Sequence, residues 1–123
     1  AERDVRMAAL RAIGTARQGA ALPRLARLVR RRELRQADRS EKTAVFDAFG
    51  AICGADGVAL LDGLLNARSL LGPRESTEMR ACAARALGLV GTEPALQALR
   101  RSVDTKDAVV RNEVARALRG GGA

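Results

Sequence analysis

The chain has 123 residues, a formal net charge of +8, no histidine and only two aromatic residues. Without histidine it lacks the residue that most acid–base sites and many metal sites use, and two aromatic rings cannot form a platform for stacking bases. The two cysteines are too few for a four-cysteine zinc site and do not form a CxxC motif. We therefore predict no catalytic residue, no metal site and no cofactor, in a single domain without a membrane-spanning segment.

Apolar residues recur at helical spacing along seven segments, and no segment shows the alternation of a strand. The predicted helices cover residues 4–14, 20–36, 41–53, 57–70, 77–89, 93–103 and 108–119. Together they form one domain over residues 1–119, and residues 120–123 are predicted to be a flexible tail.

The ends of these helices carry recognisable signals. Residues that commonly cap a helix N-terminus precede four of them: Ser40, Ser76, Thr92 and Asp107. Three helices reach a glycine after their last apolar residue, as a left-handed helix terminus requires: Gly14, Gly50 and Gly88. Gly72-Pro73 is predicted to break the chain between two helices.

Four of the helices share an internal repeat that is aligned on those glycines, with Arg119 in the glycine position of the fourth. Eight residues before this position is a basic column: Arg6, Lys42, Arg80 and Arg111. Two residues before it is an alanine column: Ala12, Ala48, Ala86 and Ala117. The helices between them carry Ala-Leu and a second leucine about one turn later. Such a repeat indicates stacked helix pairs, whose small alanines let neighbouring helices approach closely.

These columns resemble those of HEAT repeats, in particular the short bacterial HEAT-like repeats also found in phycobilin lyases. The resemblance rests on the runs Asp4-Val5-Arg6 to Gly14, Met79-Arg80 to Gly88 and Val110-Arg111 to Leu118, and it covers almost the whole chain. It implies an all-α, right-handed α-solenoid of stacked antiparallel helix hairpins, with about seven helices. It also implies that the basic column bonds an acidic side chain or carbonyl of a neighbouring repeat, for which three acids are suitably placed: Asp4, Glu78 and Asp107.

The resemblance implies binding of other macromolecules more than catalysis. The iron-dependent hydroxylase of the family needs paired His-Glu motifs, and this chain has no histidine. The alkylpurine DNA glycosylases of similar fold use aromatic residues near the lesion, and Trp and Tyr are absent here. A bilin lyase would lack polar and aromatic pocket residues in the same way. We therefore predict that the protein is not an enzyme.

A ridge of mixed charge lies three residues before the glycine position: Arg11, Asp47, Arg85 and Arg116. Helical geometry places this column away from the apolar one. If these helices form the inner layer, as in HEAT solenoids, the ridge lies on the concave surface and can hold an acidic peptide segment. A solvated face without a partner explains the same pattern.

Positive charge is concentrated near the N-terminus. Residues 1–39 hold 11 basic and 4 acidic side chains, whereas residues 40–123 hold 11 and 10. Four arginines of the predicted helix 20–36 fall on one face: Arg24, Arg27, Arg31 and Arg35. Such a stripe can bind an acidic protein, nucleic-acid phosphates or anionic lipid, or it can be a solvated face. Since 20 of the 22 basic residues are arginine, a genome-wide arginine bias is an equally good explanation.

The sequence thus predicts a protein–protein interaction scaffold that presents a curved, arginine-rich surface to a protein or acidic peptide. The alternative is nucleic-acid or anionic-surface binding through the basic N-terminal third. We expect a cytoplasmic, bacterial-type protein in which Cys53 and Cys82 are reduced, buried and without redox function. The first helix has no Ala-Leu helix before it, so we expect a longer protein that covers it. The sequence leaves the partner, the process and the oligomeric state open.

Overall fold

The computed structural model describes residues 2–120. Within them lie eight α-helices: α1 (Glu2–Ala16), α2 (Leu22–Arg30), α3 (Arg32–Gln36), α4 (Arg39–Ile52), α5 (Gly54–Asn66), α6 (Thr77–Val90), α7 (Glu93–Arg100) and α8 (Ala108–Leu118). A 3₁₀ turn, η1 (Gly19–Ala21), precedes α2, and an antiparallel hairpin of β1 (Arg68–Ser69) and β2 (Gly72–Pro73) precedes α6. Most of the predicted tail, residues 121–123, lies outside the described residues.

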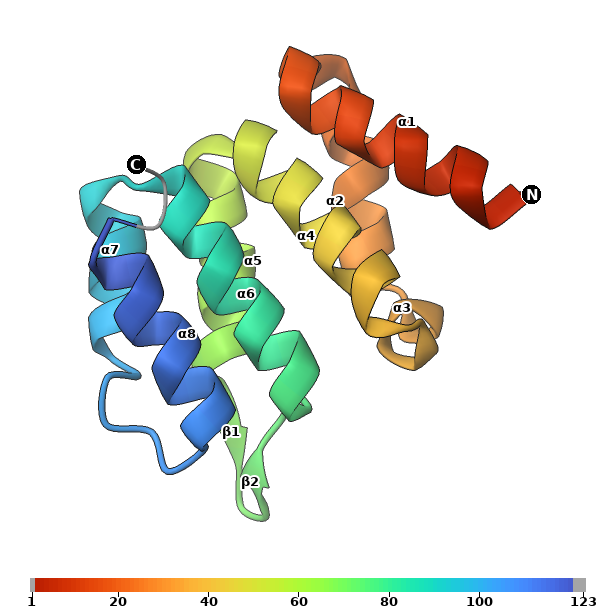
Figure 1. The fold of residues 1–123 in the computed structure, drawn as a ribbon. Helices are drawn as coiled ribbons and strands as arrows, with labels where there is room; N and C mark the ends of the chain where they lie inside the picture. Colours follow the sequence, from red (N-terminus) through yellow and green to blue (C-terminus); the bar gives the residue numbers. More distant parts are fainter. Residues whose placement is uncertain (1, 121–123) are drawn as a thin grey trace.

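The helices stack as antiparallel pairs in two layers (Figure 1). Helices α1, α4, α6 and α8 carry the glycine position and lie side by side in one layer, which we call the glycine layer. Helices α2, α5 and α7 form a second layer, the leucine layer, and each packs on a helix of the glycine layer. The prediction of an all-α stack of helix hairpins is therefore confirmed.

The core lies between the two layers and contains both aromatic residues of the chain. Phe46 and Phe49 of α4 are at most 1% exposed, and Leu61 of α5 and Leu87 of α6 are fully buried beside them in the same cluster. Because apolar residues recur every three or four positions, each helix turns one stripe into this core and leaves its other face to solvent.

The sequence predicted left-handed helix ends at the glycine column, and this prediction is wrong. Gly14, Gly50 and Gly88 lie within α1, α4 and α6, and none of them has a positive φ. Helix α6 ends instead at Gly91, whose φ of 68° is left-handed.

Each of these glycines lies where the next helix of the layer comes closest. A Cβ atom on Gly50 would lie 2.9 Å from the carbonyl oxygen of Ala86, and one on Gly88 would lie 2.8 Å from the Cβ of Ala117. A Cβ on Gly14 would lie 3.4 Å from the Cα of Ala48. The glycine of one repeat thus packs on the alanine column of the next, a contact that we call the Gly–Ala junction.

The predicted helix 20–36 is three short elements in the structure. Arg31, between α2 and α3, has an extended backbone with φ −69° and ψ 139°. The Arg35 guanidinium donates to the carbonyls of Arg30 and Arg31, at 3.4 and 3.2 Å, and to Glu75 at 2.9 and 2.6 Å. The Arg35 side chain stabilises the break because it links two backbone carbonyls at the end of α2 to the carboxylate of Glu75.

The segment between α5 and α6 also differs from the prediction of a helix to residue 70 and no strand. Helix α5 ends at Asn66, and the hairpin occupies residues 68–73. Gly72 has a φ of 124°, which side-chain-bearing residues rarely adopt, and its carbonyl accepts a hydrogen bond from the Ser69 hydroxyl at 3.2 Å. Helix α7 likewise ends at Arg100, before the predicted residue 103.

The N-caps agree with the sequence at α6 and α8 and differ at α4. Asp38, two residues before the predicted Ser40, accepts from the backbone N–H of Glu41 at 2.9 Å. Ser76 and Asp107 accept from backbone N–H groups in the first turns of α6 and α8. Thr92 is the N-cap residue of α7 but makes no capping hydrogen bond with its side chain.

Replacing Asp107 by alanine should lower the free energy of unfolding by about 1 kcal/mol at neutral pH, because α8 loses its capping acceptor. The Thr77 hydroxyl and the amides of α8 lower the pKa of Asp107. Its contribution is therefore present above the ordinary Asp pKa of 3.8 and is lost as the pH falls through the lower folded-state value. Denaturant titrations of both proteins at neutral pH and below pH 3.8 measure this difference.

Ser76→Ala is the matched control, because it removes a neutral N-cap at α6. Its cost should be of the same order and should not change over the same pH range. A cost of Asp107→Ala that stays constant with pH would show that the carboxylate does not cap α8 as a charge.

Candidate functional site

A groove crosses the exposed face of the glycine layer. It consists of two adjoining hollows, one of about 690 Å³ between α1 and α4 and one of about 480 Å³ over α4, α6 and α8. Both hollows are lined by Arg39 and Thr43, so they form one continuous surface.

All four residues of the predicted ridge line this groove. Arg11 and Asp47 line the first hollow, and Arg85 and Arg116 line the second. They line the same groove because the Gly–Ala junctions hold neighbouring helices in equivalent positions. Residues of one column of the repeat therefore lie in a row across the layer.

The ridge residues of α4 and α6 bind each other. The Arg85 guanidinium donates to both carboxylate oxygens of Asp47, from Nε at 2.7 Å and from Nη2 at 3.2 Å. This pairing raises the pKa of Arg85. Arg116 donates to Glu113 of its own helix at 3.2 Å. Acids of the groove itself therefore already pair with these two arginines.

Two other arginines of the groove have no such competition. Within the described residues, the side chains of Arg11 and Arg39 make no hydrogen bond and no ion pair, and both are exposed. Sequence reasoning missed Arg39, although its spacing of eight residues from Asp47 places it on the same face of α4. These arginines are the available donors for an acidic ligand.

Apolar side chains lie between the charges of the groove. Leu89 of α6 is 38% exposed and Val109 of α8 is 50% exposed. Leu89 lines the first hollow and Val109 the second. The groove thus carries both exposed apolar side chains and arginine donors along its length.

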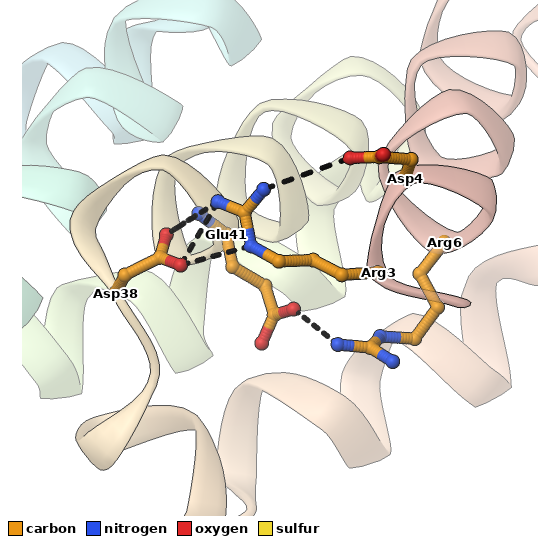
Figure 2. A network of polar contacts seen from close by, with 5 residues as sticks. All are labelled: Arg3, Asp4, Arg6, Asp38 and Glu41. Carbon is orange, nitrogen blue, oxygen red and sulfur yellow. Dashed lines mark hydrogen bonds and ion pairs between the residues drawn. The ribbon is translucent and has the colours of Figure 1, made fainter. Parts of the chain in front are cut away.

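The first three members of the basic column make contacts with the following repeat. Figure 2 shows the first step, in which Arg6 of α1 donates to Glu41 of α4 at 2.7 Å. Beside it Arg3 forms two hydrogen bonds with Asp38, at 2.9 and 3.0 Å, and lies 4.0 Å from Asp4 (Figure 2). These two ion pairs therefore link the start of α1 to the start of α4.

The next members of the column are buried. Lys42 is 5% exposed and donates to Glu78 of α6 at 2.6 Å. Arg80, also 5% exposed, donates to the carbonyl of Leu65 at 3.0 Å and to the Thr105 hydroxyl at 3.2 Å.

The last member, Arg111, is exposed and donates to the carbonyl of Thr105 at 2.9 Å. Of the acids expected beside the column, Glu78 bonds Lys42, whereas Arg6 bonds Glu41 instead of Asp4. Asp107 accepts from Thr77 and from the amides of α8.

The arginine stripe near the N-terminus is not continuous. Because the chain is extended at Arg31, that residue and Arg35 do not continue the face of α2 that carries Arg24 and Arg27. Arg35 is half-buried and held by Glu75. Arg24, Arg27 and Arg31 are exposed, and within the described residues their side chains have no hydrogen-bonding partner.

The cysteines lie in the core, as predicted. Cys53 and Cys82 are 3% and 7% exposed. Burial raises the pKa of the Cys53 thiol to about 11 and also raises that of Cys82. Both thiols are therefore protonated at neutral pH and poor nucleophiles.

Residues 2–120 contain no cluster of three or more potential metal ligands. Their helices are also too short or too polar to cross a bilayer.

Comparison with known proteins gives one result. A family model described as HEAT repeats matches residues 33–119. Neither the curated proteins nor the solved structures that were compared give a match.

Proposed function

Because the chain belongs to the HEAT repeat family through residues 33–119, we propose that it is a non-enzymatic scaffold that binds an acidic segment of a protein partner in the groove of the glycine layer. HEAT repeats are in general protein–protein interaction modules. We propose that the protein is cytoplasmic, since two buried, unpaired thiols suit a reducing compartment.

The observation that carries the proposal is the continuity of the groove. It brings the ridge arginines of three helices, together with Arg39, to one surface that also exposes Leu89 and Val109. Arginine guanidinium groups bind carboxylates bidentately, and apolar contacts add affinity that does not depend on salt. A peptide with acidic residues interspersed with leucine matches both features.

The test is the affinity of a fluorescent glutamate- and leucine-rich peptide for the chain and for the double variant Arg11→Glu/Arg39→Glu. These two arginines make no side-chain bond within the described residues, so reversing them should leave the thermal midpoint unchanged. We expect at least about tenfold weaker binding, equivalent to about 1.4 kcal/mol.

Arg24→Glu/Arg27→Glu is the matched control, since it makes the same change in net charge on α2, outside the groove. It should bind the peptide nearly as well as the wild type. Equal losses in both variants would mean that the peptide senses only net charge, and the proposal would then fail.

Nucleic-acid binding is the second candidate, and one observation favours it. Five exposed arginines lie along α2 and at the start of α3, and their side chains have no partner within the described residues: Arg24, Arg27, Arg30, Arg31 and Arg32. If they bind phosphates, affinity for generic duplex should fall steeply with salt, and Arg24→Glu/Arg27→Glu should reduce it. Absence of binding at about 50 mM salt would exclude this function.

A further inference from the structure

The turn between β1 and β2 consists of two leucines. Ser69 pairs with Gly72 at the end of the hairpin, which leaves Leu70 and Leu71 between the strands. Both leucine side chains are fully exposed, whereas Val5, another exposed apolar residue, is 68% exposed. Hairpin turns usually carry glycine, asparagine, aspartate or proline, because these residues suit the turn backbone. Two leucines at these positions add nothing to the core and therefore indicate a contact outside the chain.

The hairpin projects from the stack of helices. In Figure 1, β1 and β2 extend beyond the first turns of α6 and α8 at the lower edge of the molecule, with the turn at the far end. The leucines thus form a convex apolar tip. Such a tip can bury its surface in a lipid bilayer or in a concave pocket of another protein.

The turn keeps its shape without burial of the leucines. The Ser69 hydroxyl donates to the Gly72 carbonyl at 3.2 Å and accepts from the N–H of Leu71 at 3.3 Å. Behind the turn, the N–H of Arg74 donates to the carbonyl of Ala67 at 3.2 Å. The tip is therefore preorganised, and its insertion into a binding partner needs little further ordering of the chain.

Positive charge flanks the leucines on both strands. Arg68 of β1 and Arg74, which follows β2, are exposed, and within the described residues their side chains make no hydrogen bond and no ion pair. Residues 67–74 contain no acid. The next acid along the chain, Glu75, is bonded to Arg35 at 2.9 and 2.6 Å. The tip therefore combines apolar side chains with two uncompensated positive charges, which an anionic surface complements.

The spacing of leucines and arginines matches the layers of a bilayer. Leu70 lies two residues beyond Arg68, a separation of about 7 Å at the rise of an extended strand. Apolar groups bound at a membrane interface lie about 5–10 Å deep, at the boundary between headgroups and acyl chains. When the leucines reach that depth, Arg68 and Arg74 lie at the level of the lipid phosphates.

A bilayer also suits the placement of charge on both strands. Lipid phosphates surround an inserted tip on every side, so both arginines find an anion in any orientation of the hairpin. A protein pocket has to supply carboxylates at two matched positions of its rim. The observations therefore favour an anionic lipid surface over a protein pocket.

We infer that the hairpin inserts Leu70 and Leu71 into an anionic bilayer while Arg68 and Arg74 bind lipid phosphates. So small a contact gives reversible adsorption and not permanent anchoring. The groove of the glycine layer is lined by other residues, so this inference does not depend on the proposed peptide binding.

Co-sedimentation with vesicles tests the contact. At about 0.1 M salt, the chain should bind vesicles of phosphatidylcholine mixed with phosphatidylglycerol and bind pure phosphatidylcholine much less. Leu70→Ser/Leu71→Ser should reduce binding at least about tenfold, because burial of the two leucines is lost. Val5→Ser/Val109→Ser is the matched control, since it removes exposed apolar surface on α1 and α8, and it should bind as the wild type does. Equal binding of the leucine variant and the wild type would overturn the inference.

Arginine variants locate the electrostatic contact. Arg68→Gln/Arg74→Gln should weaken binding to the mixed vesicles about tenfold, because two charges near the lipid surface are lost. Arg24→Gln/Arg27→Gln removes the same charge from α2 and should have little effect. A larger loss in the α2 variant would place the membrane contact on that helix and would contradict the inference.

A tryptophan reporter distinguishes insertion of the tip from adsorption of the chain. The chain has no tryptophan, so Leu71→Trp introduces a single fluorophore at the tip. Its emission should shift to shorter wavelength with the mixed vesicles, whereas the emission of Val109→Trp should not. An unchanged emission of Leu71→Trp, or absence of vesicle binding, would reject the bilayer and favour a protein pocket as the partner of the tip.

Discussion

Gly50→Ala should lower the free energy of unfolding by about 1–3 kcal/mol, although alanine is the better helix former. Its new Cβ would lie 2.9 Å from the carbonyl oxygen of Ala86 and 3.1 Å from its Cα, both backbone atoms that cannot rotate away. The two helices must therefore move apart along the most extensive contact of the glycine layer. Chemical denaturation monitored by circular dichroism measures the loss.

Gly63→Ala is the matched control within α5. A Cβ on Gly63 would meet nothing within 4 Å, and the residue is exposed. The same substitution should here raise the free energy of unfolding by about 0.5–1 kcal/mol, through helix propensity alone. If Gly50→Ala also stabilises the fold, the Gly–Ala junction is not a close contact.

Arg80→Met should cost about 2–3 kcal/mol of unfolding free energy. Methionine keeps the apolar stem but removes the donors to the Leu65 carbonyl and the Thr105 hydroxyl, and unsatisfied buried acceptors cost about 1–3 kcal/mol each. Because Arg80 is only 5% exposed, water does not readily replace the lost donors. The measurement is again denaturant unfolding at neutral pH.

Arg111→Met, in the same column, is the control. Arg111 is exposed and donates only to the carbonyl of Thr105, which water can solvate when the side chain is removed. Its loss should cost less than about 0.5 kcal/mol. Similar costs for both variants would show that the buried position of Arg80 makes no difference.

The repeat made the stack of hairpins predictable, because basic, alanine and glycine columns at a near-constant period require equivalent helices. The same columns placed Arg11, Asp47, Arg85 and Arg116 on one surface. The role of the glycines was mispredicted, since a glycine after the last apolar residue is a local signal for a helix end. The actual cause, contact with an alanine of the next repeat, lies about 30 to 40 residues away.

The departures near residues 31 and 68–73 have a similar cause. No glycine or proline marks the break at Arg31. The break depends on the bond between Arg35 and Glu75, and Glu75 follows α4 and α5 in the sequence. The hairpin was recognised as a break at Gly72-Pro73, but two-residue strands are too short to show alternation. Pairings within the groove, such as Arg85 with Asp47, depend on side-chain placement across helices and leave no mark in the sequence.

The central claim is that the glycine layer forms the binding surface, and an NMR titration of the ¹⁵N-labelled chain tests it most directly. On adding the glutamate- and leucine-rich peptide, we predict that the largest amide shift changes occur around Arg39, Thr43, Leu89 and Val109, which line the groove. Changes confined to α2 and α3, or none at about 1 mM peptide, would contradict the proposal that this groove binds a protein partner.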